Sequence, residues 1–186
     1  LYAAKLVSRF HPAVIVSSGL ALGALGYLFV VFFGSRNDLL LMTSFMFLGL
    51  SVGAAQTISN DLILSSVPAN KAGAASAISE TAYEFGTVLG TVVIGGMLTA
   101  IYRAQVMVPA GLSADAAHAA GETLGGATAV AGQLPPDLSA ELLHSAHAAF
   151  DSGVLVTATF SAVLLAVLAV FTYRMLRSAP AELEKA

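Results

Sequence analysis

Long apolar segments alternate with short polar ones along this chain. A helix needs about 20 predominantly apolar residues to cross a bilayer, and four segments meet that length, at residues 12–33, 39–67, 72–102 and 150–176. In lipid, a helix satisfies its own backbone hydrogen bonds. The pattern therefore predicts an all-α fold, a polytopic transmembrane bundle of four helices.

The connections between these segments differ in length. Residues 34–38 and 68–71 are short and rich in turn-forming residues, whereas residues 104–148 form one long connection. Within it, 113–124 and 139–149 have helical composition, the second with Asp137 or Ser139 as its cap. We therefore expect a helical hairpin in this connection. Connections of this length tend to be functional or disordered, so the alternatives are a lid over the transport path and a solvated linker.

The third apolar segment carries two carboxylates near its middle. At about 1.5 Å rise per residue, Glu80 lies roughly 13 Å and Glu84 roughly 20 Å from Lys71, near the centre of the hydrocarbon layer. At about 100° per residue they fall on one polar stripe. The five stripe residues are Ser76, Glu80, Glu84, Thr87 and Thr91. A carboxylate at that depth costs about 3 kcal/mol or more unless it faces protein or water, so the stripe predicts a cavity.

The two carboxylates lie one helical turn apart. Like charges at this spacing repel, and removal from water adds to the cost of ionising both. We therefore expect at least one of Glu80 and Glu84 to retain a proton near neutral pH, as a proton carrier would. The alternative is that a glutamate only hydrogen-bonds a neighbouring helix.

Small residues form a second stripe on the same segment. Gly86 and Gly90 belong to it, and spacing of four lets another helix approach closely. A third face, which includes Ile78 and Phe85, suits lipid. The first apolar segment has a comparable seam of glycines, at Gly19, Gly23 and Gly26.

The second apolar segment becomes polar in its second half. Gln56 and Asn60 share a face with Gly49 and Gly53, and we expect this face to line the same cavity as the glutamates. Asp61 lies close to the end of the segment. Its two interpretations are a functional carboxylate and a structural hydrogen bond to backbone or a helix end.

Composition supports a membrane-embedded class. Of 186 residues, 57 % are hydrophobic and only 10 % are charged, far below the quarter typical of globular domains. The absence of cysteine excludes disulfides and Cys-based zinc sites, and the net charge of −3 argues against nucleic acid. Among the three histidines of the long connection, His144 and His147 lie one helical turn apart, but no third ligand is placed beside them. The polar face of a surface helix explains these two and His118 better, so we expect no metal and no cofactor. The glycines lie in apolar helical seams, which argues against a nucleotide site and an enzyme.

The distribution of cations predicts the orientation. Six cations lie on one side of the four segments, at Lys5, Arg9, Lys71, Arg174, Arg177 and Lys185. Arg36 and Arg103 alone lie on the other side, so both ends are expected in the cytoplasm and residues 104–148 outside. The chain starts at Leu1 in what looks like an interhelical loop, and we interpret residues 1–186 as the C-terminal fragment of one transmembrane domain. A signal peptide is the competing interpretation, but residues 13–33 are too long for its apolar core.

Several motifs resemble a known family. They are Gln56-Thr-Ile-Ser-Asn-Asp61, Ser65-Ser-Val-Pro68, Lys71-Ala-Gly-Ala-Ala-Ser-Ala-Ile-Ser-Glu80-Thr-Ala-Tyr-Glu84 and the glycine-rich residues 86–96. Together they resemble the last helices of the fourteen-helix drug/proton antiporters of the major facilitator superfamily, the QacA, LfrA and SmvA type. The resemblance implies that the four segments are helices eleven to fourteen, with an extracellular helical hairpin between the last two. It also implies a bacterial cytoplasmic membrane and ten further N-terminal helices as partners.

The resemblance implies proton coupling and recognition of cationic drugs for Glu80 and Glu84, and we add Asp61 as a third candidate. Gln56, Asn60, Thr87 and Thr91 are the expected cavity lining. The leading hypothesis is proton-coupled export of lipophilic cations, because a cationic substrate can replace the proton on a carboxylate. The alternatives are a major facilitator exporter of a neutral or anionic metabolite, and a non-transporting four-helix membrane assembly.

Overall fold

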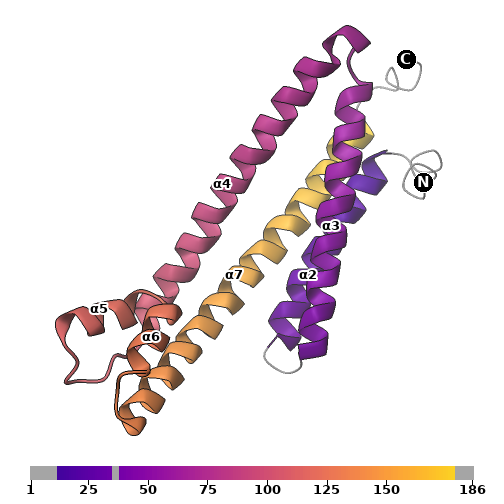
Figure 1. Ribbon diagram of the computed structural model, residues 1–186. Coiled ribbons are helices and arrows are strands. Elements are labelled where there is room, and N and C mark those ends of the chain that lie inside the picture. Colours follow the sequence, from indigo (N-terminus) through magenta and orange to yellow (C-terminus); the bar gives the residue numbers. More distant parts are fainter. Residues whose placement is uncertain (1–11, 35–37, 179–186) are drawn as a thin grey trace. The chain divides into compact units, whose positions relative to one another are not determined.

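The structure is a computed structural model that describes residues 12–34 and 38–178 (Figure 1). Its helices are α2 (Pro12–Phe33), α3 (Asp38–Ser65), α4 (Ala72–Gln105), α5 (Ala114–Glu122), α6 (Leu124–Ala131) and α7 (Pro136–Ser178), with a 3₁₀ turn, η1 (Ala69–Lys71). Four of them, α2, α3, α4 and α7, are long and apolar enough to cross a membrane. The expected all-α class with four candidate spans is therefore confirmed. Lys5, Arg9, Arg36 and Lys185, which entered the orientation argument, lie outside the described residues.

The first three apolar segments became helices with nearly the expected bounds, but the fourth did not. The separate helix expected at 139–149 is the beginning of α7, which runs unbroken from Pro136 for 43 residues. Asp137 and Ser139 lie inside its first turns and are not its cap, since the Ser139 N–H donates to the Pro135 carbonyl oxygen at 2.9 Å. Proline suits the first helical position, where its missing N–H would have had no partner. The double proline therefore begins the last span itself.

The length of α7 separates an apolar part from a polar one. At about 1.5 Å per residue, 43 residues extend roughly 65 Å, about twice the thickness of the hydrocarbon layer. Its charged residues before the apolar run are Asp137, Glu141 and Asp151. The first turns of α7 are therefore too polar for the bilayer, and the apolar remainder is long enough to cross it.

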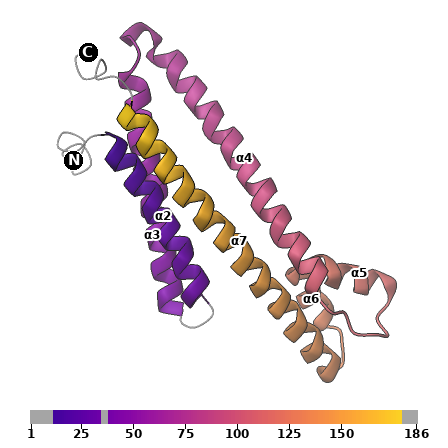
Figure 2. The same ribbon diagram turned by 180° about the vertical axis from the view of Figure 1, so that it is seen from behind.

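The chain divides into two compact units, residues 1–86 with 158–186, and residues 87–157. In the first unit, α2 and α3 lie side by side (Figures 1 and 2). The Ser51 hydroxyl on α3 donates to the Gly19 carbonyl oxygen on α2 at 2.7 Å, and Phe29 meets Phe47 edge to face with ring centroids 5.5 Å apart. The glycine seam of the first segment thus packs closely, as expected.

Gly23 offers a direct test of this seam. A Cβ at Gly23 would lie 2.5 Å from the Ser51 hydroxyl oxygen and 3.0 Å from Leu165 Cδ1. Gly23→Ala would therefore break the Ser51 hydrogen bond or separate the helices, and we expect a loss of about 1–3 kcal/mol in stability. Thermal unfolding in detergent measures it. The matched control is Gly53→Ala on α3, where no described atom lies within 4 Å of the added Cβ; an equal effect of both substitutions would contradict close packing at Gly23.

The second unit has a core of its own. Its buried residues are Tyr102, Ala120, Ala127, Val130, Ala131, Leu142, Ala146 and Ala149. Tyr102 is 2 % exposed, and its hydroxyl donates to the Ala120 carbonyl oxygen at 2.9 Å. The long connection is therefore folded onto the C-terminal turns of α4 and the first turns of α7.

The junction of α5 and α6 is tight. Thr123 ends α5 and caps α6, its hydroxyl accepting a hydrogen bond from the Gly126 N–H at 3.0 Å. A Cβ at Gly126 would overlap the Ala119 carbonyl oxygen. The two short helices, residues 114–131, form a helical pair that we call the cap.

Candidate functional site

The acidic stripe lies along α4 and is open to its surroundings. All five stripe residues, Ser76, Glu80, Glu84, Thr87 and Thr91, are exposed. Among residues 12–34 and 38–178, no side chain forms an ion pair or hydrogen bond with the carboxylate of Glu80 or Glu84. These acids thus have no counter-ion within the described part of the chain.

The polar residues of α3 show mixed exposure. Gln56 and Asp61 are exposed and Asn60 is half-buried. No described hydrogen bond or ion pair joins Asp61 to Glu80 or Glu84. The shared cavity between α3 and α4 therefore stays a prediction.

An apolar depression lies beside the stripe on α4. It has a volume of about 440 Å³ and is lined by Ala77, Ile78, Thr81, Ala82 and Phe85. Thr81 adds little polarity, because its hydroxyl donates to the Ala77 carbonyl oxygen of its own helix at 2.8 Å. The large apolar side chains of this depression, Ile78 and Phe85, lie on a different face of α4 from Glu80 and Glu84.

Two glycines of the small-residue stripe of α4 have no close neighbour among the described residues. A Cβ built at Gly86 or Gly90 meets no described atom within 4 Å. The close helix contact expected at these glycines therefore also stays a prediction.

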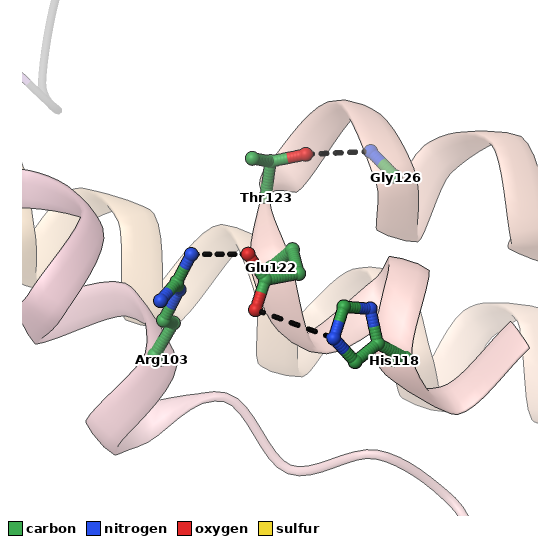
Figure 3. Close-up of polar contacts among 5 residues, drawn as sticks. All are labelled: Arg103, His118, Glu122, Thr123 and Gly126. Carbon is green, nitrogen blue, oxygen red and sulfur yellow. Dashed lines mark hydrogen bonds and ion pairs between the residues drawn. The ribbon is translucent and has the colours of Figure 1, made fainter. Parts of the chain in front are cut away.

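The histidines of the second unit do not assemble a described metal site. No group of three His, Asp or Glu side chains in residues 12–34 and 38–178 is placed to hold a metal ion. His118 instead lies beside Glu122, with 3.9 Å between Nε2 and Oε1 (Figure 3). His144 and His147 are exposed on α7.

One charged contact between α4 and α5 was not predicted from the sequence. Arg103, in the last turn of α4, forms an ion pair with Glu122 at the end of α5 (Figure 3). Residues 104–148 contain no Lys or Arg, so the cation that pairs with Glu122 comes from the end of α4. The signal was present in the sequence, since Arg103 is the residue directly before the connection, but nothing in the spacing specified which acid it would reach.

Comparison with known proteins decides the relationship. No family profile matches the chain. Residues of the chain are 49 % identical over 164 positions to the multidrug efflux pump LfrA of Mycolicibacterium smegmatis, covering 87 % of the chain and 32 % of the pump. They are 35 % identical over 159 positions to the methyl viologen resistance protein SmvA of Salmonella typhimurium, covering 80 % of the chain and 30 % of that protein. The chain is homologous to part of the multidrug efflux pump LfrA and to part of the methyl viologen resistance protein SmvA.

This homology confirms the resemblance seen in the sequence. The chain spans about a third of the length of these relatives. It is homologous to a transporter and not to an enzyme. Together with its four apolar helices, the homology makes it a multi-pass membrane protein.

Proposed function

We propose that the chain is part of a proton-coupled exporter of lipophilic cationic drugs or antiseptics in the bacterial cytoplasmic membrane. One observation carries the proposal: Glu80 and Glu84 lie on one stripe of a membrane-length helix with no described ion pair. A carboxylate at that depth is retained where it has a role or a partner. Homology to LfrA, whose name describes a multidrug efflux pump, supports drug export as that role.

The two carboxylates are the proposed sites of proton coupling and cation recognition. A lipophilic cation needs a negative charge and an apolar surface together. Glu80 and Glu84 supply the charge, and other helices of the same transporter would supply the apolar surface, because Ile78 and Phe85 lie on another face of α4. Arrival of a cation favours the ionised carboxylate and so releases its proton, which is the exchange that an antiporter performs.

Further polar residues complete the proposed site. Asp61 is a third candidate for proton coupling or substrate binding. Gln56, Asn60, Thr87 and Thr91 are proposed to line the cavity, and their side chains can hydrogen-bond water or substrate. The remaining cavity wall would come from other helices of the same transporter.

The proposed topology follows the cation distribution. Both ends of the chain lie in the cytoplasm, residues 104–148 lie outside, and the chain forms the C-terminal part of one transmembrane domain. The described cations of the cytoplasmic side, Lys71, Arg174 and Arg177, are all exposed, as the interface with headgroups and water requires. Cysteines introduced at Ala110 and Ala69 and labelled with an impermeant reagent in whole cells test it; the proposal expects labelling at Ala110 alone.

Transport in proteoliposomes tests the function. The full-length transporter, reconstituted with an imposed pH gradient, is expected to move methyl viologen or a lipophilic quaternary ammonium against its concentration gradient. A neutral analogue of similar size is the control for leakage. A transport rate that does not depend on the pH gradient would contradict proton coupling.

The small-residue stripe of α4 gives a prediction of its own. If other transmembrane helices cover α4 in the full-length transporter, Gly86→Leu or Gly90→Leu would force backbones apart and lower both yield and thermal stability. Val92→Leu, on the exposed apolar face of the same helix, is the control and is expected to be neutral. Normal yield and stability of both glycine variants would show that the stripe faces lipid.

A further inference from the structure

One described ion pair joins the cap to the rest of the second unit, in addition to a hydrogen bond and apolar packing. Arg103 on α4 contacts Glu122 on α5 through Nη2 and Oε2, and His118 lies near the other carboxylate oxygen (Figure 3). Arg103 is the one Lys or Arg in residues 87–157, whereas the acids there are Asp115, Glu122, Asp137, Glu141 and Asp151. The unit therefore has no second Lys or Arg that could take over the contact.

The apolar attachment of the cap is modest. Three of the four fully buried residues that it contributes are alanines, Ala120, Ala127 and Ala131, and the fourth is Val130. Apolar stabilisation scales with the area removed from water, so small side chains give less than a core of leucines would. Polar contacts consequently account for a larger share of the attachment, including the hydrogen bond from Tyr102 to Ala120.

The cap is also built to move as one body. Non-helical residues 106–113 and 132–135 connect it to α4 and α7, and Gly111 has a positive φ of 93° that other residues rarely adopt. Within the cap, the overlap that a Cβ at Gly126 would create shows how closely α6 approaches α5. Undocking of the cap would also release parts of the connectors, since the Met107 N–H donates to the Ser145 hydroxyl at 2.7 Å and Val106, Val108, Leu112 and Leu134 pack against the same core.

We propose that α5 and α6 undock together from α4 and α7, and that the Arg103–Glu122 pair is the latch that sets this equilibrium. The side chains of the pair are 53 % and 36 % exposed, so water and salt reach them. An exposed ion pair contributes little to the free energy of global unfolding. The free energy of a local opening is itself small, so the same contribution changes the population of the open state measurably. The latch thus makes the cap a conformational switch of the second unit that is sensitive to ionic strength.

Hydrogen exchange of the full-length transporter in lipid nanodiscs tests the proposal. We expect Arg103→Gln or Glu122→Gln to speed exchange of cap amides by about two- to fivefold, the range for an exposed ion pair, while apolar residues of α2 and α7 keep their rates. The charge-swapped double variant, Arg103→Glu with Glu122→Arg, should restore most of the protection. Asp115→Asn removes an exposed acid from the first turn of the same helix, with no described partner, and should have a smaller effect, limited to the loss of a favourable charge at the helix N-terminus.

Salt provides a second measurement that needs no substitution. At about 1 M salt the Debye length falls to roughly 3 Å. The hydrogen-exchange rate of cap amides in the wild type should therefore approach the rate in Glu122→Gln, and the rate in the variant should change far less with salt. Unchanged exchange in both single variants would overturn the proposal. Faster exchange throughout α4 and α7 would also overturn it, because the cap would then not open separately. Equal effects of Asp115→Asn would show a general charge effect and no latch.

Discussion

Glu84→Gln in the full-length transporter is expected to reduce export of lipophilic cations to background while membrane abundance stays near normal. Glutamine fills the same space and keeps a hydrogen-bonding group, but it cannot bind and release a proton. Glu84 lies on the acidic stripe near the expected centre of the hydrocarbon layer and has no described partner, so its removal breaks no contact in the described fold. Efflux of methyl viologen and of a monovalent dye, at matched abundance, measures the effect.

Two further variants serve as comparisons for Glu84→Gln. Glu84→Asp retains the carboxyl group with a shorter reach, and we expect partial export. Glu141→Gln changes an exposed acid in the polar part of α7 and should leave efflux unaltered. Wild-type efflux of both cations by Glu84→Gln would remove this residue from the mechanism.

Replacement of the cap is expected to impair efflux far more than it impairs insertion into the membrane. The variant exchanges residues 113–134 for a flexible Gly/Ser linker of equal length and leaves α7 intact from Pro136. The cap is a folded element that packs into the buried core of the second unit, and long connections with such structure tend to be functional. Its exposed acid Asp115, together with Asp137 of α7, would give the outer mouth a negative potential that attracts departing cations.

The comparison is made at matched membrane abundance and at two salt concentrations. Salt screens such a potential over about 8 Å at physiological strength, so the difference between wild type and variant should shrink at high salt if attraction is the cause. Unchanged efflux at both salt concentrations would mean that residues 113–134 only connect α4 to α7.

Hydropathy and turn residues predicted the fold well where one physical effect dominates. The bounds of α2, α3 and α4 follow from apolar runs ended by breakers such as Gly34 and Pro68, because a membrane-length helix admits few alternatives. The start of α7 was misjudged for a related reason. Composition changes near residue 150, where bilayer-compatible residues begin, but helical backbone continues on either side of that change, since polar residues form helix in water as readily as apolar ones do in lipid.

The candidate site residues could be predicted from their residue types, but the tertiary contacts around them could not. Glu80 and Glu84 stand out in sequence because carboxylates are rare in apolar segments, and helical periodicity alone places them on one stripe. The Arg103–Glu122 pair and the Tyr102–Ala120 hydrogen bond depend on how α5 folds back on α4, which periodicity does not specify. The walls of the proposed cavity depend on surfaces beyond the described residues, so no local pattern in this chain could define them.

Cation-stimulated proton release tests the central claim most directly. The full-length transporter, purified in detergent in a weakly buffered solution with a pH indicator, is mixed with a lipophilic cation at a pH near neutrality. We predict release of protons that saturates with the cation, is absent with a neutral analogue, and is lost in the double variant Glu80→Gln with Glu84→Gln. Binding of the cation without proton release, or release that persists in the double variant, would contradict the account.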